Sequence, residues 1–398
     1  MALHGDPMLQ KRLKQVRLAR GLSLEGLSER MGGVVTKQAL SKYEKGLMVP
    51  SIHVLTKIAE ALETKTAYLW TEPSVRVELT SYRRHSALLK REQESIESIV
   101  SQTMEDRVRL QELVQGPVTV NLPKRCAKVK SHEDAERTAE TLRESWNLGE
   151  APIASVIGTL EEQFIHVITI DNSNGKFDGI AAKVMDEKGG LKAAAVVTRG
   201  GLPGERQRLN LLHELGHLVM DVQPTMNEEK AAFRFAGAFL APAPLVFREI
   251  GRKRSTVQLQ ELIILKKFFG MSIQALLYRM HDLEIINKSL YTHACIQINK
   301  LGFKKSEPEP MPPEEPRWLK LTVLRAFSEG LLTKEDTERL IGEPQREASR
   351  QIMNRRAFME LSLKDRRQVL RDQAAALADH YSHDLETKDI GGGDFIEH

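Results

Sequence analysis

Residues 204–220 read GERQRLNLLHELGHLVM and decide what can be expected of this chain. The stretch contains the pattern HExxH, formed by His213, Glu214 and His217. In a helix, residues four apart lie one turn apart on the same face, so both imidazoles can reach one zinc ion. The carboxylate of Glu214, beside the first histidine, can activate a water molecule. Because buried imidazoles and carboxyl groups need a partner, this stretch predicts a zinc site.

The surroundings of this stretch support that interpretation. Apolar residues recur with helical periodicity from about residue 205 to residue 220, which predicts a buried helix. Three short apolar runs precede it, at 164–170, 179–185 and 193–198, and they predict strands. We therefore expect a small sheet, followed by the HExxH helix.

The spacing does not decide which of three acidic residues is the third metal ligand. Asp221 lies eight residues after His213, about 12 Å along a continuous helix, which is awkward for one tetrahedral ion. Glu228 and Glu229 open the next predicted helix, EKAAFRFAGAFLAP at 229–242. Either carboxylate could complete a site of two histidines and one glutamate, with a fourth position left for water.

The N-terminal part of the chain has a different character. Residues 8–70 break into short amphipathic helices, and one of these runs from Thr36 to Tyr43 and ends before Gly46. Residues 1–71 carry 11 Lys and Arg against 6 Asp and Glu, whereas the whole chain has a net charge of +4. An excess of positive charge on one small helical domain is expected if that domain contacts phosphate.

Changes in composition and the positions of Gly and Pro residues divide the chain into five segments. We expect a mostly helical α+β protein, because helical periodicity dominates outside the three strand-like runs. A Pro- and Glu-rich stretch at 306–316 predicts an extended linker, and a last charged helix is expected at 363–383. The expected segments are an all-α helix-turn-helix domain at 1–71, a helical linker at 72–129, a zincin-like peptidase domain at 130–300, a linker at 301–317, and a helical C-terminal region with a mobile tail at 318–398.

One or two long charged helices are expected at 83–115 within the first linker. This segment either connects the two domains or brings two copies of the chain together as a homodimer. The apolar residues that could form such a contact are Leu88, Ile96, Ile99 and Leu113.

Composition predicts a cytoplasmic protein. The chain has two cysteines, Cys126 and Cys295, which provide neither a disulfide framework nor a cysteine zinc cluster. We expect no membrane partner, because no apolar run approaches the roughly 20 residues of a membrane helix. The N-terminus lacks the apolar centre of a secretory signal.

The HExxH stretch and the helix after it together resemble the ImmA/IrrE family of metallopeptidases. Members pair a HELGH helix with a helix of the pattern E-x-x-A…F-A…L-x-P, and the resemblance extends over roughly 130–290. It implies that Glu229, rather than Glu228, is the third ligand of the zinc, and Arg208 also matches the family. Phe233 departs from it, because members often have Asn or Asp there, and so does Ala241, where Met is common. These departures concern the fit of the substrate more than metal binding.

Residues 21–63, GLSLEGLSERMGGVVTKQALSKYEKGLMVPSIHVLTKIAEALE, resemble the XRE (Cro/C1-type) helix-turn-helix family. The resemblance implies that the helix from Thr36 to Tyr43 enters the major groove of a DNA operator. Leu24 departs from the family, which often has a phosphate-contacting Gln there. Arg12 could also contact the DNA backbone. The candidate DNA-binding residues are Arg17, Thr36, Lys37, Gln38, Ser41 and Lys42.

Together these resemblances predict a DNA-binding regulator with a zinc-dependent endopeptidase. His213, His217 and Glu229 would bind Zn²⁺, and Glu214 would be catalytic. The family implies a protein substrate, a repressor or an antitoxin-like regulator, whose cleavage controls transcription. The alternative is a transcription factor whose peptidase-like domain senses metal or a ligand and does not cleave. An intact Glu214 favours the peptidase, because a pure sensor does not need it.

Overall fold

The computed structural model describes residues 7–72, 75–80, 90–116, 120–123, 125–170, 178–186, 188–304 and 306–342, together with 362, 364–368, 370 and 371. The chain divides into two compact units, residues 1–341 and 342–398. The fold is 58% helical with a small mixed sheet, so the predicted mostly helical α+β class is confirmed. The described residues of the second unit include a helical stretch at 364–368, and the rest of the helix expected at 363–383 lies largely outside the described residues.

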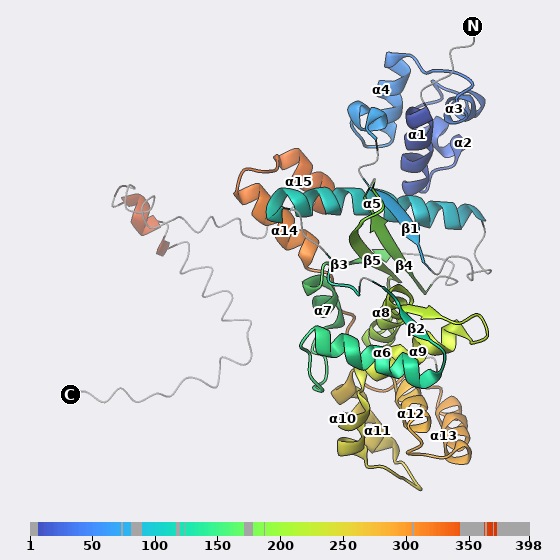
Figure 1. Cartoon of the computed structure of the whole chain (residues 1–398). Helices are drawn as coiled ribbons and strands as arrows, with labels where there is room; N and C mark the ends of the chain where they lie inside the picture. Colours follow the sequence, from blue (N-terminus) through green and yellow to red (C-terminus); the bar gives the residue numbers. More distant parts are fainter. Residues whose placement is uncertain are drawn as a thin grey trace. The chain divides into compact units, whose positions relative to one another are not determined.

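The N-terminal part of the first unit is a helical bundle (Figure 1). Its apolar core includes Leu13, Leu27 and Leu40, which come from three different helices. Helix starts are capped by side chains, since Ser23, Thr36 and Ser51 each accept a hydrogen bond from a backbone amide three residues on. The bundle consists of α1 (Pro7–Ala19), α2 (Leu24–Arg30), α3 (Lys37–Glu44), α4 (Ile52–Ala61) and the 3₁₀ helix η1 (Thr66–Trp70).

The turn between α2 and α3 depends on two glycines. Gly32 and Gly33 have φ angles of +68° and +73°, a region that side chains with a Cβ rarely adopt. The chain can therefore reverse between the two helices and expose the start of α3.

The second part of the first unit, which we expect from its sequence to be peptidase-like, is built on a sheet with strand order β1-β4-β5-β3 among the described residues. Strands β1 (Arg76–Leu79), β4 (Gly179–Met185) and β5 (Leu191–Arg199) pair antiparallel, and β3 (Ile165–Ile170) pairs parallel to β5. The three strands expected at 164–170, 179–185 and 193–198 thus lie in one sheet.

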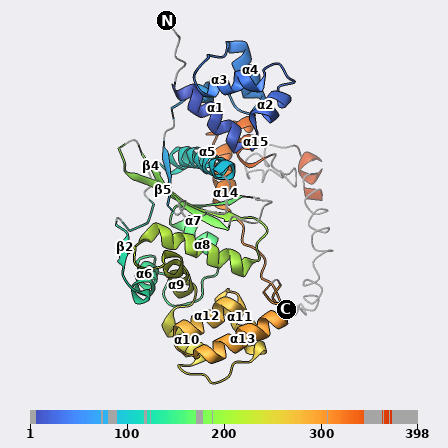
Figure 2. The same cartoon turned by 90° about the vertical axis from the view of Figure 1, so that its right-hand side faces the viewer.

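Both faces of this sheet are covered by helices. Along β5, Ala193, Ala195 and Val197 belong to one apolar cluster, whereas Ala194 and Val196 belong to another. Successive strand residues point to opposite faces, so a continuous apolar run indicates a sheet that is buried on both sides. Helix α5 (Lys90–Gln115) crosses one face and α8 (Gly204–Val219) lies on the other, as two perpendicular views agree (Figures 1 and 2).

The remaining helices of this part form the layer around α8. Helix α9 (Glu228–Leu240) packs against both α8 and α6, and a short parallel ribbon joins β2 to β6. The elements are α6 (His132–Ser145), α7 (Val156–Glu162), α10 (Ala243–Ile250), α11 (Leu259–Phe269), α12 (Ile273–Asp282), α13 (Lys288–Lys300), β2 (Ala127–Val129) and β6 (Met220–Val222).

The segment expected as a helical linker, 72–129, does more than connect. It contributes α5, but also β1 and β2, which pair with β4 and β6 of the peptidase-like part. Ile96, considered above as a contact between two copies, is buried within this chain against the sheet. Ile99 packs against the same cluster, Leu113 is exposed, and Leu88 lies outside the described residues.

The Pro- and Glu-rich stretch at 306–316 is extended and lies against the peptidase-like part. Gly204 donates its backbone N–H to the carbonyl of Met311, and a Cβ at residue 204 would lie 2.2 Å from the carbonyl oxygen of Pro312. Two helices follow, α14 (Trp318–Ser328) and α15 (Lys334–Ile341), of which α14 packs against α5.

Candidate metal centre

Helix α8 presents the HExxH residues in a buried setting. Leu211, Leu215 and Leu218 pack into the main apolar cluster, which holds the helix against its neighbours. The side chains of the motif are buried with them: His213 is 7% exposed, Glu214 4% and His217 8%. Local helix geometry and burial of the apolar face therefore bring these three polar groups into the interior together.

The two imidazoles and one carboxylate converge. The Nε2 atoms of His213 and His217 lie 3.2 Å apart. Glu229, at the start of α9, places one carboxylate oxygen 3.1 Å from His213 Nε2 and the other 3.6 Å from His217 Nε2. The ligand atoms of all three residues lie within 4.8 Å of one another.

A glycine in the motif lets α9 approach closely enough for this. A Cβ at Gly216 would lie 3.2 Å from the ring of Phe235 and 3.5 Å from Cα of Ala232, both on α9. The small residue at position 216 thus allows close packing of the two helices, which brings Glu229 over the histidines.

The donor set fits zinc. With Zn–N distances of about 2.0–2.1 Å, two nitrogen ligands of a tetrahedral ion are spaced by about 3.3 Å, close to the separation of the two Nε2 atoms. Two neutral imidazoles and a carboxylate are also a donor set found in catalytic zinc sites, which leave a position for water.

Glu214 lies against the sheet beside this group. A Cβ at Gly179, the first residue of β4, would lie 2.9 Å from Cγ of Glu214 and 3.0 Å from its Oε1. Only glycine leaves room there, so the strand and the carboxylate are in direct contact. This contact connects β4 to the glutamate that is expected to be catalytic, and the sequence pattern did not predict it.

The structure separates the three candidates for the third ligand. Asp221 lies in β6, after α8 has ended at Val219, and is exposed. Glu228 contacts His217 on the side of the ring away from the Nε2 atoms, since its Oε1 lies 2.9 Å from Nδ1 of His217. Of these acids, only Glu229 groups with the two Nε2 atoms among the described residues.

Burial favours the neutral form of His217, as a metal ligand requires. The pKa of His217 is lowered, mainly because burial disfavours the charged ring and secondly because His213 is close. Glu229 and Glu228 act in the opposite direction. The net shift keeps the imidazole available as an electron-pair donor near neutral pH.

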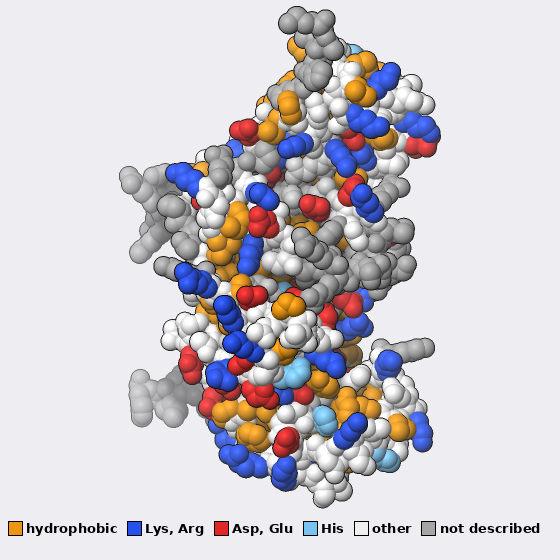
Figure 3. Space-filling view, turned by 45° about the vertical axis from the view of Figure 1, so that its right-hand side comes forward, with side chains coloured by type: hydrophobic (Ala, Val, Ile, Leu, Met, Phe, Trp, Pro, Cys, Tyr) orange, Lys and Arg blue, Asp and Glu red, His pale blue; other side chains and the backbone are white. Residues whose placement is uncertain are grey.

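In the N-terminal bundle, α3 exposes the predicted recognition surface. Thr36 caps the helix by accepting a hydrogen bond from the amide of Ala39, at 3.3 Å. Lys37, Gln38 and Lys42 are exposed and Ser41 is half-buried, and Lys37 forms an exposed ion pair with Glu25 on α2, at 2.9 Å. Lys and Arg side chains gather over this bundle on the face drawn in Figure 3, with fewer acidic side chains among them.

Two arginines expected to contact the DNA backbone have a different role. Arg17 is buried and pairs with Glu44 through Nε at 2.6 Å and Nη2 at 2.8 Å, so its guanidinium stabilises the bundle. Arg12 is 1% exposed and donates to Glu105 on α5 at 2.6 Å. The expectation for both residues is corrected, because their donors are used inside the protein. Sequence could not reveal this, since their partners lie 27 and 93 residues away.

Comparisons with known families agree with the resemblances expected for the N-terminal bundle and for the peptidase-like part. Residues 13–69 match the helix-turn-helix family, and residues 195–281 match the family described as the IrrE N-terminal-like domain. The two matches support a fusion of an XRE-type helix-turn-helix and an ImmA/IrrE-like domain in this chain. No curated protein matches the chain.

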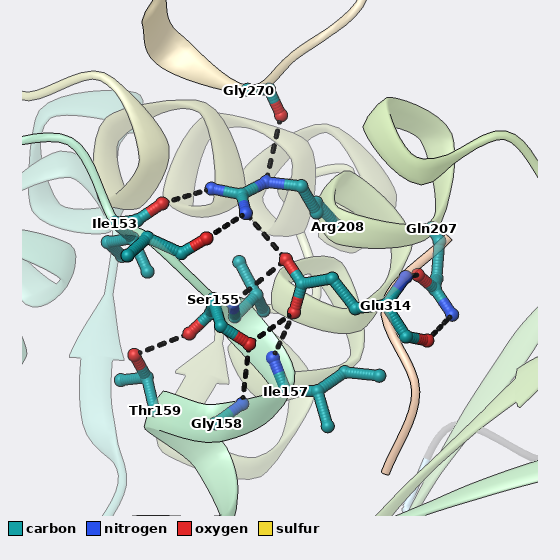
Figure 4. A network of polar contacts seen from close by, with 11 residues as sticks. Ile153, Ser155, Ile157, Gly158, Thr159, Gln207, Arg208, Gly270 and Glu314 are labelled. Atoms are coloured by element: carbon teal, nitrogen blue, oxygen red, sulfur yellow. Dashed lines mark hydrogen bonds and ion pairs between the residues drawn. The ribbon is translucent and has the colours of Figure 1, made fainter. Parts of the chain in front are cut away.

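The matched region of the ImmA/IrrE-like domain contains all four residues of the candidate centre, and the family indicates a metallopeptidase-like domain. Arg208, which also matches the family, lies on α8 before the motif and is 2% exposed. Its guanidinium donates to the carbonyls of Ile153, Ala154 and Gly270 and to the carboxylate of Glu314, as Figure 4 shows for most of these contacts. Arg208 therefore anchors the helix of the metal centre to three separate segments.

Among the described residues, no single helix is long and apolar enough to cross a membrane. Helices α9 and α10 reach the necessary length and apolar character only together, and they are bent by 62° at the break between them.

Proposed function

We propose that this chain is a cytoplasmic, DNA-binding regulator with zinc-dependent endopeptidase activity, which cleaves a repressor or an antitoxin-like regulatory protein. One observation carries the proposal: three side chains that could hold a metal ion converge next to a buried glutamate, in the region that matches the IrrE-like family.

His213, His217 and Glu229 would hold the zinc ion through the two Nε2 atoms and the carboxylate. When bound, zinc supplies Lewis acidity, which polarises the scissile carbonyl and lowers the pKa of a water molecule. Burial of His217 among the apolar residues around α8 favours its neutral form, which is the form that can bind a metal.

Glu214 would transfer the proton. Its carboxylate takes a proton from the attacking water, and the water oxygen bonds to the carbonyl carbon of the substrate. Glu214 then delivers that proton to the amine as the peptide C–N bond breaks. Glu214 packs against Gly179, where there is no room for a side chain, and this limits where the carboxylate can lie.

The helix-turn-helix domain would bring this activity to an operator. Thr36, Lys37, Gln38, Ser41 and Lys42 on or next to α3 have the side chains that bond phosphates and base edges. Fusion of the two parts in one chain would raise the local concentration of the peptidase near a substrate bound to DNA.

Metal content tests the first part of this proposal. We expect about one zinc per chain in protein purified without chelators, and loss of that zinc in His213→Ala. His281→Ala, which changes a histidine of α12 outside the group, is the matched control and should keep zinc. Wild-type protein that binds no zinc, even when zinc is added, would contradict the proposal.

Cleavage tests the second part. Glu214→Gln should bind zinc like the wild type but cleave a co-encoded candidate repressor at least about 100-fold more slowly, because the proton acceptor is lost. Equal cleavage by both proteins would refute the role of Glu214. If wild-type protein binds zinc and DNA but cleaves no candidate regulator, the alternative of a non-cleaving metal sensor is favoured.

A further inference from the structure

The two histidines of the candidate centre are supported differently. Both Nε2 atoms face the same point, but their Nδ1 atoms have different surroundings. Nδ1 of His217 lies 2.9 Å from Oε1 of Glu228. Nδ1 of His213 is buried and has no hydrogen-bond partner among the described residues. The centroid of the Phe233 ring lies 4.2 Å from the centroid of the His213 ring.

A carboxylate only accepts hydrogen bonds, so the contact with Glu228 determines which nitrogen of His217 carries the hydrogen. Nδ1 must donate, and the neutral ring then has its lone pair on Nε2. That nitrogen is the one that faces His213 and Glu229. The contact therefore selects the tautomer that can bind a metal and also fixes the plane of the ring.

The position of Glu228 on α9 explains how the chain can use adjacent acids for two tasks. Glu228 and Glu229 are the first two residues of α9, directly after the cap residue Asn227. Successive helix residues point in directions about 100° apart. One carboxylate consequently reaches the Nε2 atoms, and its neighbour reaches the far side of the His217 ring.

We propose that Glu228 is the positioning residue of the metal centre, which orients His217 and holds it as an Nε2 ligand, whereas His213 is held by packing against Phe233. This inference rests on the proposed metal site and assigns within it a role that ligand spacing does not reveal. Loss of such a carboxylate partner typically weakens metal binding by 10–100-fold.

The first test measures zinc affinity by competition with a chromophoric chelator, on the full-length chain. Glu228→Ala and Glu228→Asp should each weaken zinc binding about 10–100-fold, since the first removes the acceptor and the second withdraws it. Glu228→Gln keeps the length and an acceptor oxygen, so it should lose less than either. Glu229→Ala should lose more than any of them, because it removes a ligand.

A matched control separates orientation of His217 from stability of the helix. Asn227→Ala removes the cap that accepts from the amide of Lys230 at 3.0 Å, and so weakens the start of α9 without touching His217. It should lower the thermal midpoint and leave zinc affinity within about threefold of wild type. A loss of zinc in Asn227→Ala equal to that in Glu228→Asp would overturn the proposal, since weakening of the helix would then explain both.

The second test does not depend on metal. In metal-free protein with ¹⁵N-labelled histidine, NMR should show His217, assigned with His217→Gln, in the Nδ1–H form, and Glu228→Ala should shift it toward the Nε2–H form. Unchanged tautomer and unchanged zinc affinity in Glu228→Ala would overturn the role of Glu228 alone. If zinc fails to bind to wild type, the proposed function fails, and the tautomer still decides whether Glu228 orients the ring.

Discussion

The carboxylate of Glu314 lies 2.5 Å from Nη1 of Arg208, a residue of the helix that carries the metal-binding motif. The same carboxylate accepts hydrogen bonds from the hydroxyl of Ser155 and from the amides of Val156 and Ile157, at the start of α7 (Figure 4). A stretch with the composition of a linker is thus fastened to the interior of the peptidase-like part. It leads directly into α14, which packs on α5.

Removal of this carboxylate should destabilise the fold. Glu314→Ala leaves the buried guanidinium of Arg208 with only carbonyl partners, and breaking a buried ion pair from one side typically costs about 3–5 kcal/mol. Because Glu314 is partly exposed, we expect about 2–3 kcal/mol, measured by urea unfolding. Glu315→Ala, at the exposed neighbouring residue, should change stability by less than about 0.5 kcal/mol. Equal effects in the two variants would contradict the anchoring role of Glu314.

The contact between β4 and Glu214 predicts a defect in catalysis without loss of metal. Gly179→Ala places a methyl group 2.9–3.1 Å from Glu214 and from the carbonyl of Val197, so the carboxylate must move. A displacement of about 1 Å can lower a rate about 100-fold, and we expect a loss of that order in cleavage with zinc content unchanged. Gly26→Ala in α2, whose Cβ would come no closer than 3.4 Å to any atom, should cleave normally. Normal cleavage by Gly179→Ala would show that the position of Glu214 is not critical.

The exposed face of α3 predicts where DNA affinity can be reduced. The double variant Lys37→Ala, Gln38→Ala should weaken operator binding about 10-fold or more and reduce its dependence on salt, because one cationic contact is lost. Lys300→Ala removes one exposed charge from α13 and serves as the control, with little expected change. Fluorescence anisotropy at two salt concentrations, with circular dichroism to confirm folding, provides the measurement. Unaltered binding would favour a bundle that contacts proteins instead of DNA.

A buried histidine outside the metal centre predicts the response to acid. Burial lowers the pKa of His166 from 6.5 to about 3, and nearby Arg107 acts in the same direction. The ring lies 3.1 Å from Oε1 of Gln111 and packs against Trp318, so it stays neutral in the folded chain. Below pH 6.5 the unfolded chain binds a proton that the folded chain does not bind, so stability falls as the pH falls through this range.

The size of this effect follows from the shift. At pH 5 the proton taken up by the unfolded state should lower the free energy of unfolding by about 2 kcal/mol relative to neutral pH. The free energy of unfolding can be measured with urea at pH 7.5 and at pH 5. The difference between the two values should be about 2 kcal/mol smaller in His166→Gln than in the wild type. His132→Gln, which changes an exposed histidine at the start of α6, should keep the wild-type difference. If His166→Gln also retained it, burial of this ring would not account for the sensitivity to acid.

The sequence by itself determined the features that depend on nearest neighbours along a helix or strand. The i, i+4 spacing of His213 and His217 places both rings on one face of any helix that forms there. The cap at Thr36 and the double glycine before it likewise define the start of α3 locally. The strands were predicted for the same reason, because strands that are buried on both faces consist mostly of apolar residues.

Only the tertiary structure decided which distant groups meet. Glu228 and Glu229 are equivalent by spacing, and the crossing of α9 over α8 at Gly216 assigns one to the Nε2 atoms and the other to Nδ1 of His217. Arg17 has the composition of a phosphate contact, yet folding buries it against Glu44. Such pairings depend on how separate elements pack, and the energy of a buried charge is set by partners that lie far away in the sequence.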